Sequence, residues 1–162
     1  MIIGNIGWQP LLVDFGLQEH QLGYLYSIAA GIGIAMPFGT RLLKKYKPKN
    51  VLSWLLVVRM VLLFSIIFIY PPMFIILSVI FLFNQGFRSL KGPVLQPYIH
   101  KFVPDNIRAT VISVQSMFMQ FSAVIIGILA GILIDSYGVQ NVISIGSLLG
   151  IIAIILYQKI KD

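Results

Sequence analysis

Long stretches without charged side chains recur along this sequence, and they limit its fold more than any other feature. Four segments are each about as long as a membrane-spanning helix and contain at most one charge: 21–40, 51–70, 109–134 and 139–158. A fifth, 73–87, reaches that length only by continuing through Arg88 to Lys91. A spanning helix needs about 20 mostly apolar residues, because each adds about 1.5 Å and the hydrocarbon core is about 30 Å thick. We therefore predict an all-α, polytopic bundle of transmembrane helices.

The composition agrees with a membrane protein and excludes several classes of site. Hydrophobic residues make up 58% of the chain and charged residues only 10%, whereas a soluble domain is about 25% charged. The chain has no cysteine, and its two histidines, His20 and His100, are too far apart for metal-ligand spacing. We therefore expect no enzyme activity, no metal and no cofactor. Basic membrane loops explain the net charge of +7 better than nucleic acid does.

The first 13 residues, Met1–Val13, are apolar but too short to cross a bilayer. At about 1.5 Å per residue they extend roughly 20 Å, about two thirds of the hydrocarbon thickness. They also lack the basic start and the cleavage site of a secretory signal. We interpret them as the second part of a helix whose first part is missing. The sequence then predicts about five and a half spans in a single transmembrane domain, 1–162, truncated at its N-terminus.

Basic residues are distributed unevenly between the connections. Eleven of the 12 Lys and Arg residues lie in alternate connections: Arg41, Lys44, Lys45, Lys47 and Lys49, then Arg88, Lys91, Lys101 and Arg108, then Lys159 and Lys161. Cytoplasmic loops of membrane proteins are enriched in these residues. We therefore predict that these connections and the C-terminus are cytoplasmic, in a multi-pass protein of the cell membrane.

Small residues recur at four-residue spacing, which is typical of close helix packing in lipid. The rows are Ser27, Gly31, Ala35 and Gly39 in the second span, Ala123, Gly127 and Gly131 in the fifth, and Gly146 and Gly150 in the sixth. Two bends also look alike: each has a late Gly, a short polar turn and then an Asn, Asn50 or Asn141, as a candidate N-cap. With the predicted topology, this similarity indicates two inverted three-helix repeats.

Three motifs resemble those of a known transporter family. Gly39 is followed by the basic turn Lys44-Lys45-Tyr46-Lys47, at the place of the family pattern Gly-x-x-x-Asp-Arg-x-Gly-Arg-Arg, although Leu43 and Tyr46 replace the Asp and the second Gly. The run Pro93-x-x-x-Pro97-Tyr98 precedes Arg108-Ala109-Thr110, and Gly131-x-x-x-Asp135-x-x-Gly138 ends the fifth span. Over essentially its whole length, the chain resembles the C-terminal half of a major facilitator superfamily transporter, spans seven to twelve.

The resemblance implies two six-helix halves around a midplane cavity that opens alternately to each side. The chain would supply one half of a transporter for an unknown small solute, with the lipid bilayer and a missing or separate N-terminal half as its partners. Alone it would lack transport competence, because alternating access needs both halves. The alternative is a non-transporting accessory or anchoring membrane protein.

Polar residues within the spans are the candidates for the substrate cavity. They are Gln9 in the first span, Asn84, Gln85 and Arg88 in the fourth, and Ser116 and Gln120 in the fifth. Arg88 would favour an anionic group on the solute, or it anchors the span at the interface. The alternative role for Ser116 and Gln120 is helix packing, and the alternative for Gln9 is a position at the membrane interface.

Two further sets of residues have other expected roles. The resemblance suggests that the conformational loop motifs comprise Gly39, Lys44, Lys45, Arg108, Gly131 and Asp135. Arg59 is the one charged residue near the middle of a predicted span. We favour a structural role for it, by pairing with a helix end or by extending toward the interface, over a role in transport.

Overall fold

The computed structural model describes residues 7–39, 45–71 and 73–159, with the side chains of 98–102 excepted. Its elements are α2 (Trp8–Asp14), α3 (Glu19–Ala35), the 3-10 helix η1 (Met36–Gly39), α5 (Pro48–Phe64), the 3-10 helix η2 (Ser65–Phe68), α6 (Phe74–Phe102), α7 (Asp105–Tyr137), α8 (Val139–Ser147) and α9 (Gly150–Gln158). The described ranges contain helices and no strand, so the prediction of an all-α bundle is confirmed.

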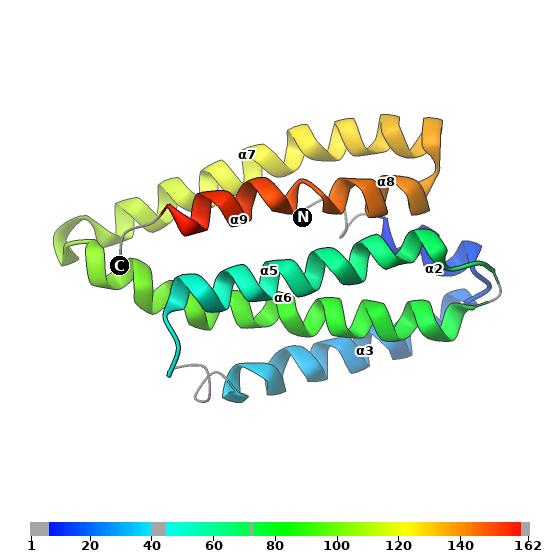
Figure 1. Cartoon of the computed structure of the whole chain (residues 1–162), viewed down its shortest axis with the longest axis horizontal. Coiled ribbons are helices and arrows are strands. Elements are labelled where there is room, and N and C mark those ends of the chain that lie inside the picture. The colour runs from blue at the N-terminus through cyan, green and yellow to red at the C-terminus, as the bar shows by residue number, and fades with distance from the viewer. Residues whose placement is uncertain (1–6, 40–44, 72, 160–162) are drawn as a thin grey trace.

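Five helical segments are long and apolar enough to cross a membrane: Glu19–Gly39, Pro48–Phe68, Phe74–Pro97, Asp105–Tyr137 and Val139–Gln158. They correspond in order to the five charge-poor stretches of the sequence. The long helices run side by side, with α7 at one edge of the bundle and α3 at the other, and the α8–α9 pair, α5 and α6 between them (Figure 1). The short α2 packs near one end, against α6 and α8.

The fourth span extends further than its apolar stretch. Gly86, Gly92 and Pro93 do not interrupt it: α6 continues as one helix of 29 residues to Phe102, with Pro93 and Pro97 inside it. Each proline removes a backbone donor from the helix. The helix is nevertheless continuous, so the charged residues Arg88 and Lys91 lie within α6 and not in a loop.

The prediction that Asn50 and Asn141 are N-caps is wrong at both bends. α5 begins at Pro48, with Lys47 at the N-cap, because the fixed φ of proline suits the first helical position. α8 begins at Val139, and Gly138 precedes it with φ of 80°, a value that favours glycine. Asn141 instead donates from Nδ2 to the Tyr137 carbonyl at 3.0 Å. Each Asn therefore lies inside the first turn of its helix.

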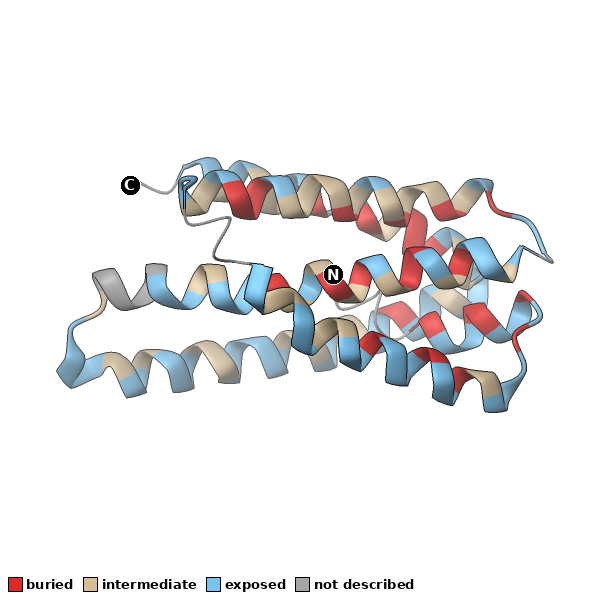
Figure 2. Ribbon diagram, turned by 90° about the horizontal axis from the view of Figure 1, so that it is seen from below, coloured by how far each residue is buried: buried red, intermediate tan, exposed pale blue. Residues whose placement is uncertain are grey.

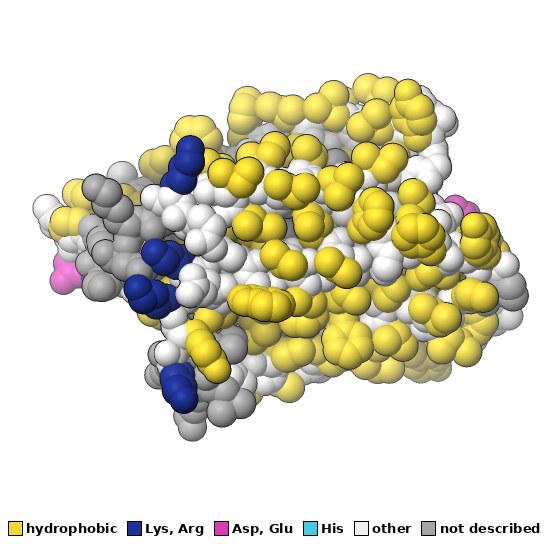
Figure 3. All heavy atoms as spheres, viewed as in Figure 1, with side chains coloured by type: hydrophobic (Ala, Val, Ile, Leu, Met, Phe, Trp, Pro, Cys, Tyr) yellow, Lys and Arg dark blue, Asp and Glu magenta, His cyan; other side chains and the backbone are white. Residues whose placement is uncertain are grey.

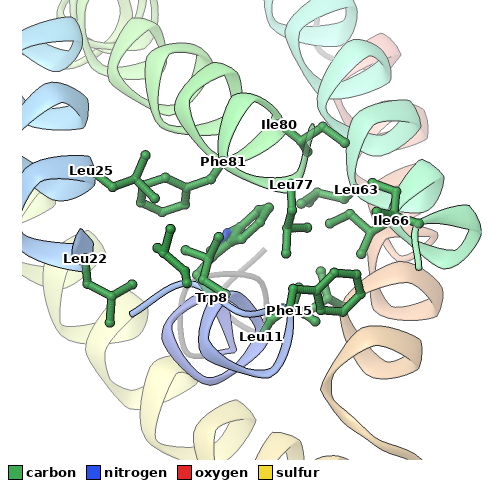
Figure 4. Close-up of a cluster of buried hydrophobic side chains, with 14 of the residues drawn as sticks. Trp8, Leu11, Phe15, Leu22, Leu25, Leu63, Ile66, Leu77, Ile80 and Phe81 are labelled. Carbon is green, nitrogen blue, oxygen red and sulfur yellow. The ribbon is translucent and has the colours of Figure 1, made fainter. Parts of the chain in front are cut away.

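The apolar core lies toward the end of the bundle that contains α2, where most of the buried segments in Figure 2 are found. Trp8 of α2 is 1% exposed, and its ring meets Phe81 of α6 edge to face, with centroids 5.2 Å apart. Leu11, Leu77 and Ile66 close around this pair (Figure 4). The short α2 is thus anchored by burial of large side chains and not by its length.

Helix α3 packs on α6 through a different face from the predicted one. Leu22, Leu25 and Ala29 are buried, whereas all four members of the small-residue row that starts at Ser27 are exposed. The close approach between these helices occurs at Gly86 of α6 instead. A Cβ built there would come within 2.9 Å of the Met36 Cε atom.

Polar contacts join α5 and η2 to the last span along its whole length. Gln140 donates from Nε2 to the carbonyls of Ile66 and Ile69, at 2.9 and 2.8 Å. Nearer the middle, the Ser147 hydroxyl donates to the Met60 carbonyl at 3.4 Å, and toward the other end Gln158 Nε2 donates to Ser53 Oγ at 3.0 Å. These contacts set the register of the α8–α9 pair against α5.

Helix α7 is the most exposed of the spans. Ala130 is its one buried residue, and among the described elements α7 packs mainly on α8. Apolar side chains cover the visible face of the molecule, while the Lys and Arg side chains on that face gather at one end (Figure 3). This pattern is typical of membrane helices, whose apolar sides face lipid and whose basic residues gather at one membrane surface.

Candidate functional site

The most buried polar contact in the spans joins Arg59 of α5 to Asn84 of α6. Arg59 is 6% exposed and Asn84 is 0% exposed. The Arg59 Nε atom donates a hydrogen bond to Asn84 Oδ1 at 2.7 Å. A buried charge is costly unless polar partners compensate it, and hydrogen bonds to charged groups are the strong ones. One partner of Arg59 is therefore a side chain of the next span, Asn84.

Depth in the membrane explains why these two residues meet. α5 with η2, and α6, form a helical hairpin whose turn lies between Phe68 and Phe74. Arg59 precedes that turn by about as many residues as Asn84 follows it, and both segments rise about 1.5 Å per residue. The two side chains consequently lie at a similar distance from the turn. Asn84 is thus directed toward α5.

A first cavity, of about 240 Å³, lies between α5, α6 and α9. Its polar lining residues are Arg59, Lys91 and Tyr157, one from each helix. The rest of the lining is apolar and includes Leu52 and Phe87. None of α5, α6 and α9 contains an Asp or a Glu, so the cavity is lined by cationic and phenolic groups within an apolar wall.

A second cavity, of about 380 Å³, lies between α3 and α6. Gln85 and Arg88 of α6 line it, opposite Tyr26 and Gly33 of α3. Arg88 is exposed and Gln85 is half-buried. Of the six predicted cavity residues, the structure brings these two together in one cavity.

The other predicted cavity residues lie elsewhere. Gln9 is exposed on α2, while Ser116 is half-buried and Gln120 exposed on α7. These three are absent from the lining of the α3–α6 cavity, and Asn84 is turned toward Arg59. Helix α7 packs mainly on α8 among the described elements, so it does not bring Ser116 and Gln120 to α6.

The predicted loop residues are spread along the chain. Gly39 ends η1, Lys45 is exposed just before α5, and Lys44 lies outside the described residues. Arg108 forms an ion pair with Asp105 within the first turn of α7, and its Nη2 lies 3.5 Å from the Val103 carbonyl, to which it donates. Gly131 and Asp135 are both exposed on α7.

Sequence reasoning missed two cavity residues, Tyr26 and Tyr157. Both tyrosines lie close to span ends, and the sequence suggested an interfacial position for them. In the structure Tyr26 lines the α3–α6 cavity and meets Phe81 edge to face at 5.1 Å, and Tyr157 lines the cavity beside Arg59. Identifying them requires knowing which helices are neighbours. Across 7–39, 45–71 and 73–159, no cluster of His, Cys, Asp and Glu has the size needed to hold a metal ion.

Comparison with known proteins gives one consistent result. Residues 1–161 match the family model described as Major Facilitator Superfamily. The chain is also 27% identical over 161 residues to an uncharacterised MFS-type transporter, YxaM, of Bacillus subtilis (strain 168). That alignment covers 96% of this chain but only 40% of the relative, so the chain spans less than half of the relative's length. No solved structure matches the chain significantly.

Proposed function

Because the chain belongs to the major facilitator superfamily, a family of membrane transporters and not of enzymes, we propose that it forms one half of a transporter for a small solute. Transport would proceed by alternating access, in which two halves rock against each other around a central site. The observation that carries this proposal is the α3–α6 cavity, which Gln85 and Arg88 line with polar groups from within a span.

The chemistry of this cavity favours a solute with an anionic group. Arg88 supplies a permanent positive charge, Gln85 supplies both a donor and an acceptor, and Tyr26 supplies a hydroxyl. Gln9, Ser116 and Gln120 would complete the cavity from α2 and α7 once the second half is present. Asn84 would act indirectly, by holding Arg59 on the α5 side of α6.

The orientation follows from the distribution of charge. We propose that the chain is the C-terminal half, in the cell membrane, with its basic connections and its C-terminus in the cytoplasm, since the positive-inside rule favours that arrangement. The three helices α2, α3 and α5 and the spans formed by α6, α7 and α8–α9 would be the two inverted repeats. The carboxylates of the five long spans, Glu19, Asp105 and Asp135, lie at or near span ends, so coupling to protons would require an acid in the other half, or the transporter is a facilitator.

The exposed α7 supports a partner half. This helix of 33 residues buries only Ala130 in the described structure, and a second six-helix half would cover part of it. The chain alone would then expose its cavity face to lipid, and we expect no transport by the isolated chain.

The experiment is an immunoblot of source membranes with an antibody against the tail around Lys159. A band well above 18.1 kDa would show that the chain is part of a longer transporter. A band at 18.1 kDa that co-purifies with a separate six-span protein would show a half encoded by its own gene. A stable band at that size with no such partner would overturn the proposal and favour an accessory or anchoring protein.

A further inference from the structure

The cavity between α5, α6 and α9 is separate from the proposed transport cavity and has a different lining. Arg59, Lys91 and Tyr157 line it from three helices. They bring two cations and a phenol to one apolar hollow of about 240 Å³. A water molecule occupies about 30 Å³ of liquid, so the hollow has room for a group with several oxygen atoms.

Positive charge accumulates around this cavity without acidic neighbours on the same helices. Arg59 and Lys91 both line this cavity, so two like charges lie around the same hollow. Like charges repel more strongly in the low dielectric of a protein interior than in water. Since α5, α6 and α9 contain no Asp or Glu, the counter-charge that would relieve this repulsion is not supplied by the helices that form the cavity.

The Arg59 side chain is fixed for binding. Its Nε atom is held by Asn84 Oδ1 at 2.7 Å, which restrains the plane of the guanidinium. A guanidinium forms directed hydrogen bonds to phosphate, and lysine acts there as a point charge. The Tyr157 hydroxyl adds a neutral donor. This combination of donors suits a tetrahedral oxyanion better than a carboxylate or a halide.

The cavity lies toward the basic end of the bundle. Leu52 is near the start of α5, just after Lys47 and Lys49, and Tyr157 is near the end of α9, just before Lys159. Basic pockets between spans at such an end are typical binding sites for phospholipid head groups. The apolar lining, with Leu55 and Leu56, suits the start of an acyl chain.

We propose that this cavity binds a phosphate group, held by Arg59, Lys91 and Tyr157. The phosphate belongs either to the head group of an anionic phospholipid or to a free phosphate anion. In both cases the bound group joins α9 to the α5–α6 hairpin.

The test measures binding and thermal stability of the full chain, purified in a neutral detergent. Phosphatidylglycerol, phosphatidylcholine and inorganic phosphate are added separately, the apparent Kd is taken from the rise in Tm, and retained lipids are counted by native mass spectrometry. Lys91→Met removes a charge from the cavity, and Tyr157→Phe removes only a hydroxyl. Lys159→Met, at the same end but outside the cavity lining, is the matched control.

We expect phosphatidylglycerol to raise Tm with one molecule retained, and phosphatidylcholine to have no effect. Lys91→Met should weaken this binding about tenfold or more, because a hydrogen bond to a charged group is lost, and Lys159→Met should not weaken it. Tyr157→Phe should weaken the binding less than Lys91→Met does. If Lys91→Met does not fold, the Tyr157→Phe variant still tests the proposal. Stabilisation by inorganic phosphate alone, lost in the same variants, would identify a free anion as the ligand. Absence of binding by both probes, or equal weakening by Lys159→Met, would overturn the proposal.

Discussion

The Arg59 guanidinium and the Asn84 amide form a buried hydrogen bond of 2.7 Å between α5 and α6. Asn84→Leu removes the acceptor and leaves the charge of Arg59 in place, so we expect the free energy of unfolding to fall by about 2 kcal/mol. Asn84→Asp keeps an acceptor and adds a compensating charge, so it should retain stability. Reversible unfolding in mixed micelles measures both. Gln85→Leu, one residue along α6 and outside this contact, is the control, and an equal loss there would contradict the assignment.

Gly86 is a point of close approach between α6 and the α3–η1 segment. A Cβ at this position would lie 2.9 Å from Met36 Cε and 3.1 Å from Ile32 Cγ2. Gly86→Ala should lower the free energy of unfolding only slightly, because the end of the Met36 side chain can move. Gly86→Val should lower the free energy of unfolding by about 1–3 kcal/mol through overpacking.

The matched controls for this close approach are Gly31→Ala and Gly31→Val on α3, the other helix of the contact. A Cβ at Gly31 meets open space, so Gly31→Ala should leave the unfolding midpoint unchanged or raise it slightly. Equal effects of Gly86→Val and Gly31→Val would show that helix propensity, and not the contact between α6 and α3, determines the cost.

Gln140 links the start of the last span to the end of η2. Its Nε2 atom donates to the carbonyls of Ile66 and Ile69, at the helix end where carbonyls lose their regular intrahelical donors; the Ile66 carbonyl also accepts from the Ile69 N–H at 3.0 Å. Gln140→Leu should lower the free energy of unfolding by about 1–2 kcal/mol, since two hydrogen bonds are lost. It should also speed amide hydrogen exchange in residues 66–71. The neighbouring Asn141→Ala, which affects one bond within its own hairpin, should change the stability by less than about 0.5 kcal/mol.

The positions of the spans could be predicted from the sequence, because the bilayer itself imposes their length and polarity. The uncharged stretch 139–158 corresponds to the span Val139–Gln158. The extent of α6 could not be predicted from hydropathy, because the helix continues beyond its apolar part to Phe102 and includes two prolines.

The contacts between spans were harder to predict, for a physical reason. In lipid, apolar residues suit both the packed and the lipid-facing side of a helix, so hydrophobicity does not indicate which face is buried. The row from Ser27 to Gly39 therefore predicted a contact face for α3 that is in fact exposed. The Arg59–Asn84 pair was, in principle, predictable, because both residues are rare polar groups at matching distances from one turn.

Arg88 should determine the charge preference of the proposed transport cavity. In the full-length transporter, Arg88→Gln should lower uptake of an anionic solute at least about tenfold, because a charged hydrogen bond is lost, and Arg88→Lys should retain part of it. Uptake into proteoliposomes, normalised to the amount of protein, measures this. The control is Lys159→Gln, which removes a cation outside the cavity lining, and this variant should transport normally. Unchanged uptake with Arg88→Gln would place the solute elsewhere.

The central claim is that α6 lines a pathway reached alternately from both sides of the membrane. The chain contains no cysteine, so Gln85→Cys introduces a single thiol into this half of an otherwise cysteine-free full-length protein. Leu77→Cys, on the same helix at a position that is 0% exposed, is the matched control.

The measurement is the labelling of each thiol by a membrane-impermeant reagent, in right-side-out and in inverted vesicles. The account predicts that the thiol at position 85 is labelled in both kinds of vesicle, while the thiol at position 77 is labelled in neither. Labelling of position 85 from one side only, or from neither side, would contradict alternating access through this cavity.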